Sequence, residues 1–166
     1  MKALNNQDLK EKLNLNNKFN DNDLEGEKID PYYLQNKKIA GFYFEYSKLG
    51  SEYLLENVFE MCTMDSCDFH GASFNGSIFN NCQFINCFLR KTELISIRFD
   101  NCSFVNCDLS RSQILCSKIF NTKFFNCNFS GLQLCDSIVE DTILSVWSDQ
   151  MIISNNNIER NVIRIM

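Results

Sequence analysis

Large apolar residues recur at every fifth position through the middle of the chain. Starting from Met64, each step of five lands on an apolar side chain as far as Leu144. This period matches neither the 3.6-residue repeat of an α-helix nor the two-residue alternation of a β-strand. It therefore predicts a repeat architecture built from short stacked units. The apolar centres are Met64, Phe69, Phe74, Phe79, Phe84, Leu89, Leu94, Phe99, Phe104, Leu109, Ile114, Ile119, Phe124, Phe129, Leu134, Val139 and Leu144.

A second column, of mostly small residues, lies two positions before each apolar centre. Only Ile97 and Leu132 are not small. A third column, two positions after the centre, is rich in Asn, which tolerates a left-handed backbone and hydrogen-bonds locally, so we expect it at corners. The small column holds Cys62, Cys67, Ala72, Ser77, Cys82, Cys87, Thr92, Cys102, Cys107, Ser112, Ser117, Thr122, Cys127, Ser137 and Thr142, and the Asn column holds Asn81, Asn86, Asn101, Asn106, Asn121 and Asn126.

Units such as CDFHG, ASFNG, CQFIN, CSFVN, CDLSR and CNFSG resemble the pentapeptide-repeat family, and the match runs without a gap over residues 62–144. The resemblance implies an all-β fold, a right-handed quadrilateral parallel β-helix with N- and C-terminal caps. Each coil of this solenoid has four five-residue sides, with the centre and the small residue pointing inward. The spacing supports four sides independently, because Cys62, Cys82 and Cys102 stand twenty residues apart. Successive coils should lie ~4.8 Å apart, as strands do in any sheet.

The pattern divides the chain into four segments. Residues 1–16 are expected to form a short N-terminal helix or a disordered tail. Residues 17–61 keep apolar centres, but Lys and Glu enter the small column, so we expect divergent early coils or an N-terminal cap there. Residues 62–145 form the regular β-helix. Residues 146–166 form a C-terminal cap, because the register breaks and resumes one residue out of phase at Ile153, Ile158 and Ile163, with Trp147 covering the open end of the core. A short C-terminal helix is the alternative.

Nine cysteines invite an interpretation as ligands or disulfides. Structural zinc favours cysteine pairs separated by two to four residues that converge on one point, whereas each of these cysteines would lie on a different side or coil. Stacked side chains that point in parallel also give a poor disulfide torsion. We therefore interpret the column cysteines as small buried residues, with no metal and no cofactor. Cys116 and Cys135 lie outside the column and should be more exposed.

Catalytic constellations are also not evident in the sequence. His70, the single histidine, follows the centre Phe69 and should point outward, away from the inward cysteines. There is no Gly-rich phosphate loop, and a core filled with Phe and Leu leaves no interior pocket for a substrate. We expect a protein that is not an enzyme.

The charge balance bears on partners and location. The net charge is −5, and the acidic residues are spread along the chain, which argues against a direct nucleic-acid-binding surface. The start MKALNNQDLKEK has no apolar signal region, and no apolar run is long enough to cross a membrane. We expect a cytoplasmic bacterial protein that has free thiols and no membrane contact.

Two outward apolar stripes are the candidate partner contacts. Ile85, Val105 and Phe125 stack on one side of the coil, and Ile95 and Leu115, followed by Cys135, stack on the opposite side. An exposed apolar stripe usually marks a contact surface. The alternatives are that the N-terminal segment or a C-terminal extension covers it, or that it forms a homodimer.

Two functions from different classes follow. The first is a non-enzymatic protein–protein interaction module, a rigid rod that presents its faces to an unknown protein partner in a regulator, effector or immunity role. The second comes from the family resemblance: quinolone-resistance members imitate a DNA duplex and bind DNA gyrase, which requires rows of outward carboxylates. Here basic residues are interspersed among the acidic ones, and of the carboxylates in the repeats only Asp68 and Asp108 are expected to share a column, separated by Phe88. The interaction module is therefore the preferred hypothesis, and a structural accessory without a tight partner is a third.

Overall fold

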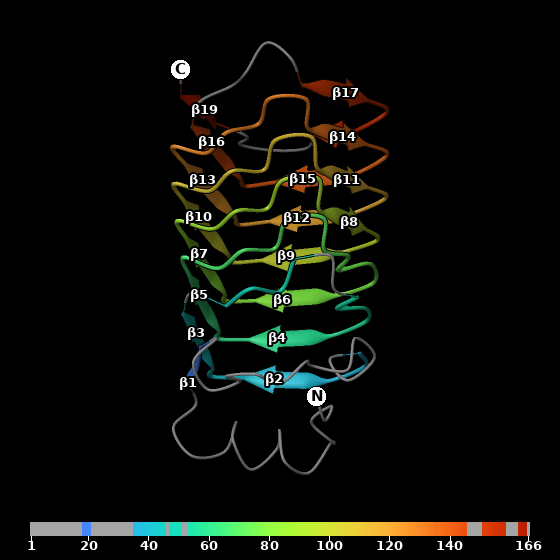
Figure 1. Ribbon diagram of the computed structural model, residues 1–166. Coiled ribbons are helices and arrows are strands. Elements are labelled where there is room, and N and C mark those ends of the chain that lie inside the picture. The colour runs from blue at the N-terminus through green and yellow to red at the C-terminus, as the bar shows by residue number, and fades with distance from the viewer. Residues whose placement is uncertain are drawn as a thin grey trace.

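The computed structural model describes residues 18–20, 35–45, 47–50, 53–145, 151–158 and 163–165. Over these residues the chain winds into a right-handed quadrilateral parallel β-helix, which confirms the predicted fold class (Figure 1). All of the described regular elements are strands of two or three residues. The rod is therefore built from very short sides and many corners.

Three sides of the coil form parallel sheets (Figure 1). The eight-stranded face contains β1 (Lys18–Asn20), β3 (Tyr43–Glu45), β5 (Thr63–Asp65), β7 (Gln83–Ile85), β10 (Ser103–Val105), β13 (Lys123–Phe125), β16 (Ile143–Ser145) and β19 (Ile163–Ile165). The four-stranded face, opposite it, contains β8 (Glu93–Ile95), β11 (Gln113–Leu115), β14 (Gln133–Cys135) and β17 (Ile152–Ser154). The seven-stranded face contains β2 (Lys38–Ala40), β4 (Val58–Glu60), β6 (Ile78–Asn80), β9 (Arg98–Asp100), β12 (Lys118–Phe120), β15 (Ile138–Glu140) and β18 (Asn157–Ile158).

The fourth side, which we call the bridge face, has isolated bridges in place of strands. A single ladder joins Lys48, Asp68, Phe88, Asp108 and Asn128 from coil to coil. Here the chain turns more tightly, because the amide of the residue three after the centre donates to the carbonyl of the centre. These bonds run from Ala72 to Phe69, from Thr92 to Leu89, from Ser112 to Leu109 and from Leu132 to Phe129.

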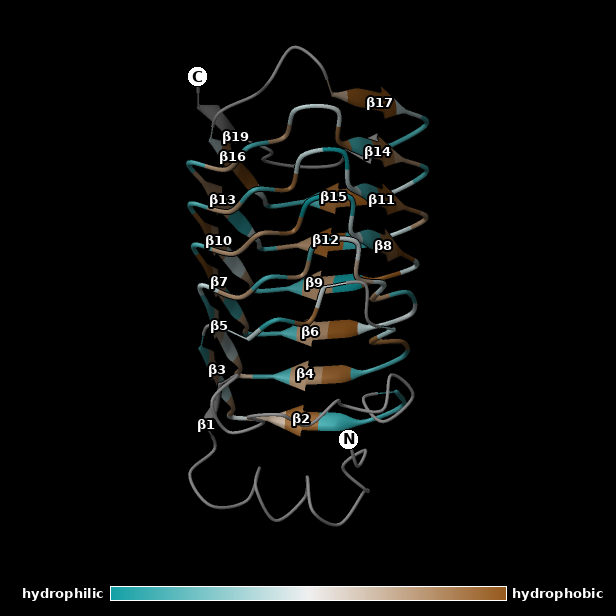
Figure 2. Ribbon diagram, viewed as in Figure 1, coloured by the Kyte–Doolittle hydropathy of each residue, from teal (hydrophilic) through white to brown (hydrophobic). Residues whose placement is uncertain are grey.

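The core consists of the two inward columns that the sequence predicts. Centres and small residues from Leu54 to Leu144 are buried. Aromatic centres stack directly along the axis, with ring centroids 4.4 Å apart for Phe84 and Phe104 and 4.6 Å apart for Phe104 and Phe124. Figure 2 shows hydrophobic residues recurring in the strands of successive coils, while hydrophilic residues occupy many of the connecting corners. The repeat thus fills the rod with side chains and leaves the corners to polar groups.

The small column is also a column of hydrogen-bond donors. The Oγ of Ser77 donates to the carbonyl of Leu54 at 3.0 Å, and the Oγ1 of Thr92 donates to that of Phe69 at 3.1 Å. Cysteine thiols make the same contact with the centre twenty-three residues earlier. Buried polar groups need such partners, so small size and a donor are both selected at this position.

Every described corner uses a left-handed residue two positions after the centre. Asn81, Asn86, Asn101, Asn106, Asn121 and Asn126 have φ between 48° and 54°, as the sequence predicts for this column. Their side chains also form ladders: the Nδ2 of Asn101 donates to the Oδ1 of Asn81 at 2.6 Å, and that of Asn106 donates to Asn86 at 3.2 Å. Residues without this tolerance, such as Met61 and Arg111, adopt the same conformation.

The early coils bury a polar residue in the small column and leave a charged one outside the core. Asn57 is fully buried in the small column, where its Oδ1 accepts a bond from the amide of Lys37 and its own amide donates to the Oγ of Ser77. Lys37 itself is exposed. Further back, Phe19 pairs with Phe44, so this coil is five residues longer than the others. The boundary between cap and early coils stays a prediction, and residues 1–17 lie outside the described part of the chain.

At the C-terminal end the described residues are strands. Ile153 and Ile158 pair with Leu134 and Val139, one residue out of phase, as expected. The expectation for Ile163 is wrong, because it pairs with Ile143 and leaves Arg164 beside the centre Leu144. Ile153 and Ile158 follow their ladder partners by nineteen residues and Arg164 follows Leu144 by twenty, so the twenty-residue spacing of the regular coils is restored. Trp147 lies outside the described residues.

Candidate interaction surfaces

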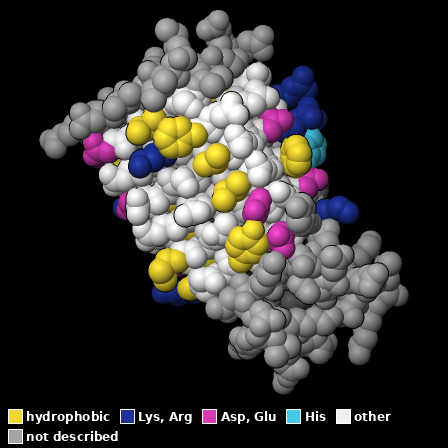
Figure 3. Space-filling model, turned by 90° about the vertical axis from the view of Figure 1, so that its left-hand side faces the viewer, with side chains coloured by type: hydrophobic (Ala, Val, Ile, Leu, Met, Phe, Trp, Pro, Cys, Tyr) yellow, Lys and Arg dark blue, Asp and Glu magenta, His cyan; other side chains and the backbone are white. Residues whose placement is uncertain are grey.

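The first predicted stripe lies on the eight-stranded face. Ile85, Val105 and Phe125 are direct ladder partners on β7, β10 and β13, so their side chains stand one above another. Ile85 and Val105 are half-buried by their neighbours, while Phe125 is 39% exposed. Figure 3 shows hydrophobic side chains in an oblique row across this face. Toward the N-terminus the same column continues with Asp65, which pairs with Ile85 and accepts a hydrogen bond from the Tyr43 hydroxyl at 2.9 Å.

The second predicted stripe lies on the opposite, four-stranded face. Ile95, Leu115 and Cys135 are ladder partners on β8, β11 and β14, and all three are half-buried. The stripe ends in a polar residue, because the ladder partner of Cys135 on β17 is Ser154, while the exposed Ile152 and Ile153 lie beside Gln133 and Leu134 in the neighbouring columns. The structure thus places every predicted contact residue outward, but the two stripes lie on different faces and form two separate surfaces.

The most exposed aromatic of the regular coils is one that the stripe search missed. Phe88 lies on the bridge face one position before a centre and is 54% exposed. It belongs to the ladder between Asp68 and Asp108, so it breaks an otherwise polar column. A search for apolar residues immediately before the centre would have found it, since that position also points outward.

The carboxylates are arranged differently from the sequence expectation. The expectation that only Asp68 and Asp108 share a column is wrong, because Asp100 and Glu140 both pair with Phe120 on the seven-stranded face. Glu60 belongs to the same column through Asn80. A separation of forty residues is two complete coils, and this relation is readable from the numbering alone.

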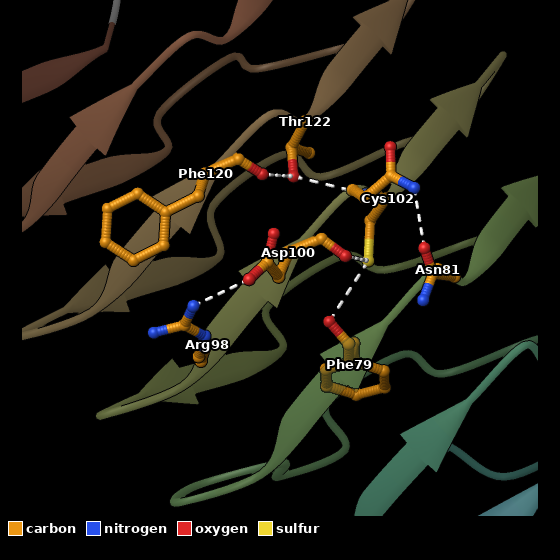
Figure 4. Close-up of polar contacts among 8 residues, drawn as sticks. Phe79, Asn81, Arg98, Asp100, Cys102, Phe120 and Thr122 are labelled. Atoms are coloured by element: carbon orange, nitrogen blue, oxygen red, sulfur yellow. Dashed lines mark hydrogen bonds and ion pairs between the residues drawn. The ribbon is translucent and has the colours of Figure 1, made fainter.

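Basic residues neutralise part of this acidic column. Lys38 lies 3.0 Å from Glu60, and the Nη2 of Arg98 lies 2.6 Å from the Oδ2 of Asp100. Figure 4 shows the second pair beside Phe120, whose ring centroid is 4.8 Å from the Arg98 guanidinium carbon. The column is therefore an alternation of acidic, amide and aromatic groups with cations beside it, and exposed pairs of this kind contribute little stability.

A shallow groove of ≈ 360 Å³ runs along the corner beside this column. Its walls are Glu60, Asn80 and Asp100 on one side and Met61, Asn81 and Asn101 on the other. Its two carboxylates are the ones already paired with Lys38 and Arg98, so the groove offers amide groups more than free charge.

The seven cysteines of the small column are buried core residues. Cys82 and Cys102 are buried, and Figure 4 shows the Cys102 thiol directed at the carbonyls of Phe79 and Asp100. The hydrogen bond with the Cys102 thiol, together with burial, raises the pKa of Cys82 from 9.0 to about 12. A thiol with a raised pKa stays protonated at neutral pH and is a poor nucleophile. Among the described residues no group of three His, Cys, Asp or Glu could hold a metal ion.

The remaining predicted positions agree with the structure. Cys116 is exposed and Cys135 is half-buried, as expected for thiols outside the small column. His70 is exposed on the bridge face while the neighbouring Cys67 is fully buried, so the two cannot form a nucleophile–base pair. Within the described residues no helix is long and apolar enough to cross a bilayer.

Comparisons with known proteins agree with this geometry. Residues 77–113 match the family model described as pentapeptide repeats, with 8 copies. Residues 77–113 are pentapeptide repeats. This confirms the resemblance on which the fold prediction depended. No curated protein sequence matches the chain significantly.

Solved structures of other proteins are similar in fold. A trypsin-treated variant of QnrB1, a plasmid-mediated fluoroquinolone resistance protein, superposes with a TM-score of 0.58 at 14% identity and covers 84% of this chain and 83% of its own. A second trypsin-treated variant of the same protein gives a TM-score of 0.57 at 16% identity, with coverage of 84% and 81%. A pentapeptide-repeat protein from the Arabidopsis thaliana thylakoid lumen gives 0.47 at 17% identity, with coverage of 68% and 74%. At these identities the likeness concerns the fold alone.

Proposed function

We propose that this pentapeptide-repeat protein is a non-enzymatic protein-binding module of the cytoplasm, a rigid rod that docks a protein partner through the stripe Ile85–Val105–Phe125. The stripe carries the proposal because it is outward, continuous over three coils and held in register by ladder hydrogen bonds. A flat, pre-ordered apolar surface loses little conformational freedom on binding, so its burial contributes directly to affinity. The buried thiols fit a reducing compartment.

The contrast between the interior and the surface supports a binding role without catalysis. Phe and Leu side chains fill the coil, so no reactant can enter it. The groove beside Asp100 contains carboxylates that are already paired with cations. The chemistry available to a partner is therefore that of the outer faces.

The test is an affinity capture from the native host with three forms of the protein. The first is the unaltered chain. The second carries Ile85→Thr, Val105→Thr and Phe125→Thr, because Thr is polar yet suits strands. The third carries Ile95→Thr and Leu115→Thr on the opposite face, as a matched control.

We expect one protein to be captured by the unaltered chain and by the control, and to be lost with the triple variant. With the purified partner, the triple variant should raise the Kd by at least about tenfold, which corresponds to about 1.4 kcal/mol. Capture of the same partner by all three forms, at equal strength, would reject the stripe as the contact. Melting curves of the three forms should coincide within a few degrees, which separates lost binding from lost folding.

A second candidate function is DNA mimicry directed at gyrase. The fold likeness to QnrB1, which is described as a fluoroquinolone resistance protein, is the observation in its favour. The arrangement of charge weighs against it: in the described coils Phe120 separates Asp100 from Glu140, and Phe88 separates Asp68 from Asp108. Inhibition of gyrase supercoiling, or protection of gyrase from a quinolone, at micromolar protein would favour mimicry over the stripe.

A further inference from the structure

The bridge face carries an outward surface that is separate from both stripes. It consists of Phe88 and of three cations, Arg90, Lys91 and Arg111. We call the three cations the basic corner. All four side chains are exposed. Figure 3 shows hydrophobic, acidic and basic side chains gathered around the cyan histidine at the edge where the eight-stranded face turns into this side.

The backbone at the basic corner has the left-handed conformation found at every described corner. The corner column of the bridge face reads Gly71, Lys91, Arg111 and Gly131, one residue per coil. Gly71 and Gly131 have φ of 70° and 73°, while Lys91 and Arg111 have φ of 56° and 58°. Only glycine adopts this left-handed conformation without cost. The chain therefore places two long cations at positions where its own neighbouring coils show that glycine fits.

The carboxylates of this face are already engaged, whereas two of the cations are not. The Oδ1 of Asp68 accepts from the amide of His70 at 2.9 Å, and the Oδ1 of Asp108 accepts from that of Ser110 at 3.0 Å. The Nε of Arg90 lies 3.7 Å from the Oδ2 of Asp108. Lys91 and Arg111 have no ion pair with any described residue. An exposed pair of cations with no ion pair to any described residue points to a ligand that carries negative charge.

We propose that the basic corner and Phe88 form a docking surface for an acidic segment of a partner protein. Lys91 and Arg111 lie on adjacent coils, ~4.8 Å apart along the axis, so together they can bind two neighbouring carboxylates. Phe88 lies on the same side of the coil, three residues before Lys91, and it supplies an apolar anchor beside the cations. The segment therefore combines an apolar residue with acidic residues a few positions away. This surface is separate from the stripe, and its test can fail or succeed independently of the proposed function.

A protein segment fits this surface better than a nucleic acid. Asp68 and Asp108 flank Phe88 in its ladder, so a phosphate backbone crossing the aromatic ring would run against two carboxylates. The net charge of −5 also repels a polyanion at long range. A peptide can avoid both effects by directing its acidic side chains only at the corner.

The experiment measures the fluorescence anisotropy of a labelled peptide with a Leu-Phe pair, a two-residue Gly-Ser spacer and a short run of Glu. The critical variant is Lys91→Gly with Arg111→Gly, which removes both charges and gives the corner the residue that Gly71 and Gly131 already have. Because this change relieves backbone strain, the variant should fold at least as stably as the unaltered chain. Lys118→Gln with Lys123→Gln, exposed cations on other faces, is the matched control for two lost charges.

We expect the unaltered chain and the control to bind the peptide with sub-millimolar affinity at low salt, and the glycine variant to bind at least about tenfold more weakly. Phe88→Ser should weaken binding to a similar extent, and a peptide with Gln in place of Glu should not bind. The proposal is overturned if the glycine variant binds like the control, if the Gln peptide binds equally well, or if the Glu peptide does not bind at all. Tighter binding of a single-stranded oligonucleotide than of the peptide would also overturn it.

Discussion

The thiol of Cys82 donates a hydrogen bond to the main-chain carbonyl of Phe59, 3.4 Å away in the preceding coil. Cys87 makes the same contact with Met64 at 3.3 Å, and Ser77 makes it with Leu54. The cysteines are therefore more than space-filling residues, since each thiol satisfies a carbonyl that no water can reach. This relationship explains why Cys, Ser and Thr interchange along the column.

Alkaline pH should destabilise the protein through Cys82. The folded state holds the pKa of Cys82 at about 12, above its ordinary 9.0, so the proton is retained on folding. Below pH 9 the stability contributed by this thiol is intact; from pH 9 toward pH 12 the unfolded chain loses a proton that the folded chain keeps. The contribution of Cys82 to the free energy of unfolding should fall by about 1.4 kcal/mol per pH unit in this range.

Chemical denaturation at several pH values checks this, with Cys82→Ser as the matched variant. Serine does not titrate and can donate to Phe59 as Ser77 does to Leu54. We expect the two proteins to be similar at pH 7 and the variant to lose less stability above pH 9. Parallel pH profiles would show that Cys82 does not titrate in this way.

Removal of a stacked ring should be costly. Phe84 is buried, and its ring stacks on Phe104 at 4.4 Å, so Phe84→Ala leaves a cavity in the middle of the rod. The expected loss is about 3–5 kcal/mol, measured by urea unfolding. Phe125→Ala, on the outer side of the same face, is the control and should cost far less. Equal losses for the two variants would contradict the inward assignment of Phe84.

One corner offers a stabilising substitution. Met61 has φ of 52° and its side chain is 65% exposed, whereas Asn81 and Asn101 occupy the same corner in the next coils. Met61→Asn should relieve the left-handed strain and extend the amide ladder by one step. A gain of about 1 kcal/mol is expected, or about 2–4 °C in Tm. Met61→Ala keeps the strain and should give no gain in the same melting experiment.

The amide ladders should contribute measurably to stability. Asn106 donates to Asn86 and accepts from Asn126 at 2.9 Å, with φ of 54°. Asn106→Ala loses both bonds and strains the corner, for an expected cost of about 1–2 kcal/mol. Asn106→Gly loses the bonds but not the backbone fit, so it should cost less. If the alanine and glycine variants melt together, the backbone contribution is negligible.

The columns of the fold could be predicted because each unit repeats the same physical requirement. The residues at the positions of Phe84 and Cys82 point inward in every coil. Their spacing in the sequence therefore shows which side chains face the core and how successive coils are aligned. The early coils were harder to predict, because the burial of Asn57 depends on the amide of Lys37 and the hydroxyl of Ser77, which reach it only after the coil closes. The restored phase at Arg164 could not be predicted, because the apolar pattern favours Ile163 as the centre, whereas the ladder pairs Arg164 with Leu144.

The surfaces were predicted only in part. The stripe Ile85–Val105–Phe125 follows from the period of twenty, and the column shared by Asp100 and Glu140 follows from the same period and was overlooked. The outward position of Phe88, one residue before the centre Leu89, also follows from the repeat and was overlooked too. The placement of Arg98 over Phe120 depends on three-dimensional packing, because it joins side chains from adjacent coils.

The ladder that sets Phe125 above Val105 exists only because twenty residues separate them. A tandem duplication of one whole coil would therefore lengthen all four faces and keep every residue on its own side. Gain or loss of a five-residue unit that forms one side of a coil would instead rotate everything beyond it by a quarter turn and divide the stripe between two faces. Such changes in length give this chain a discrete evolutionary route to new partners, in which surfaces are recombined while the core sequence stays the same.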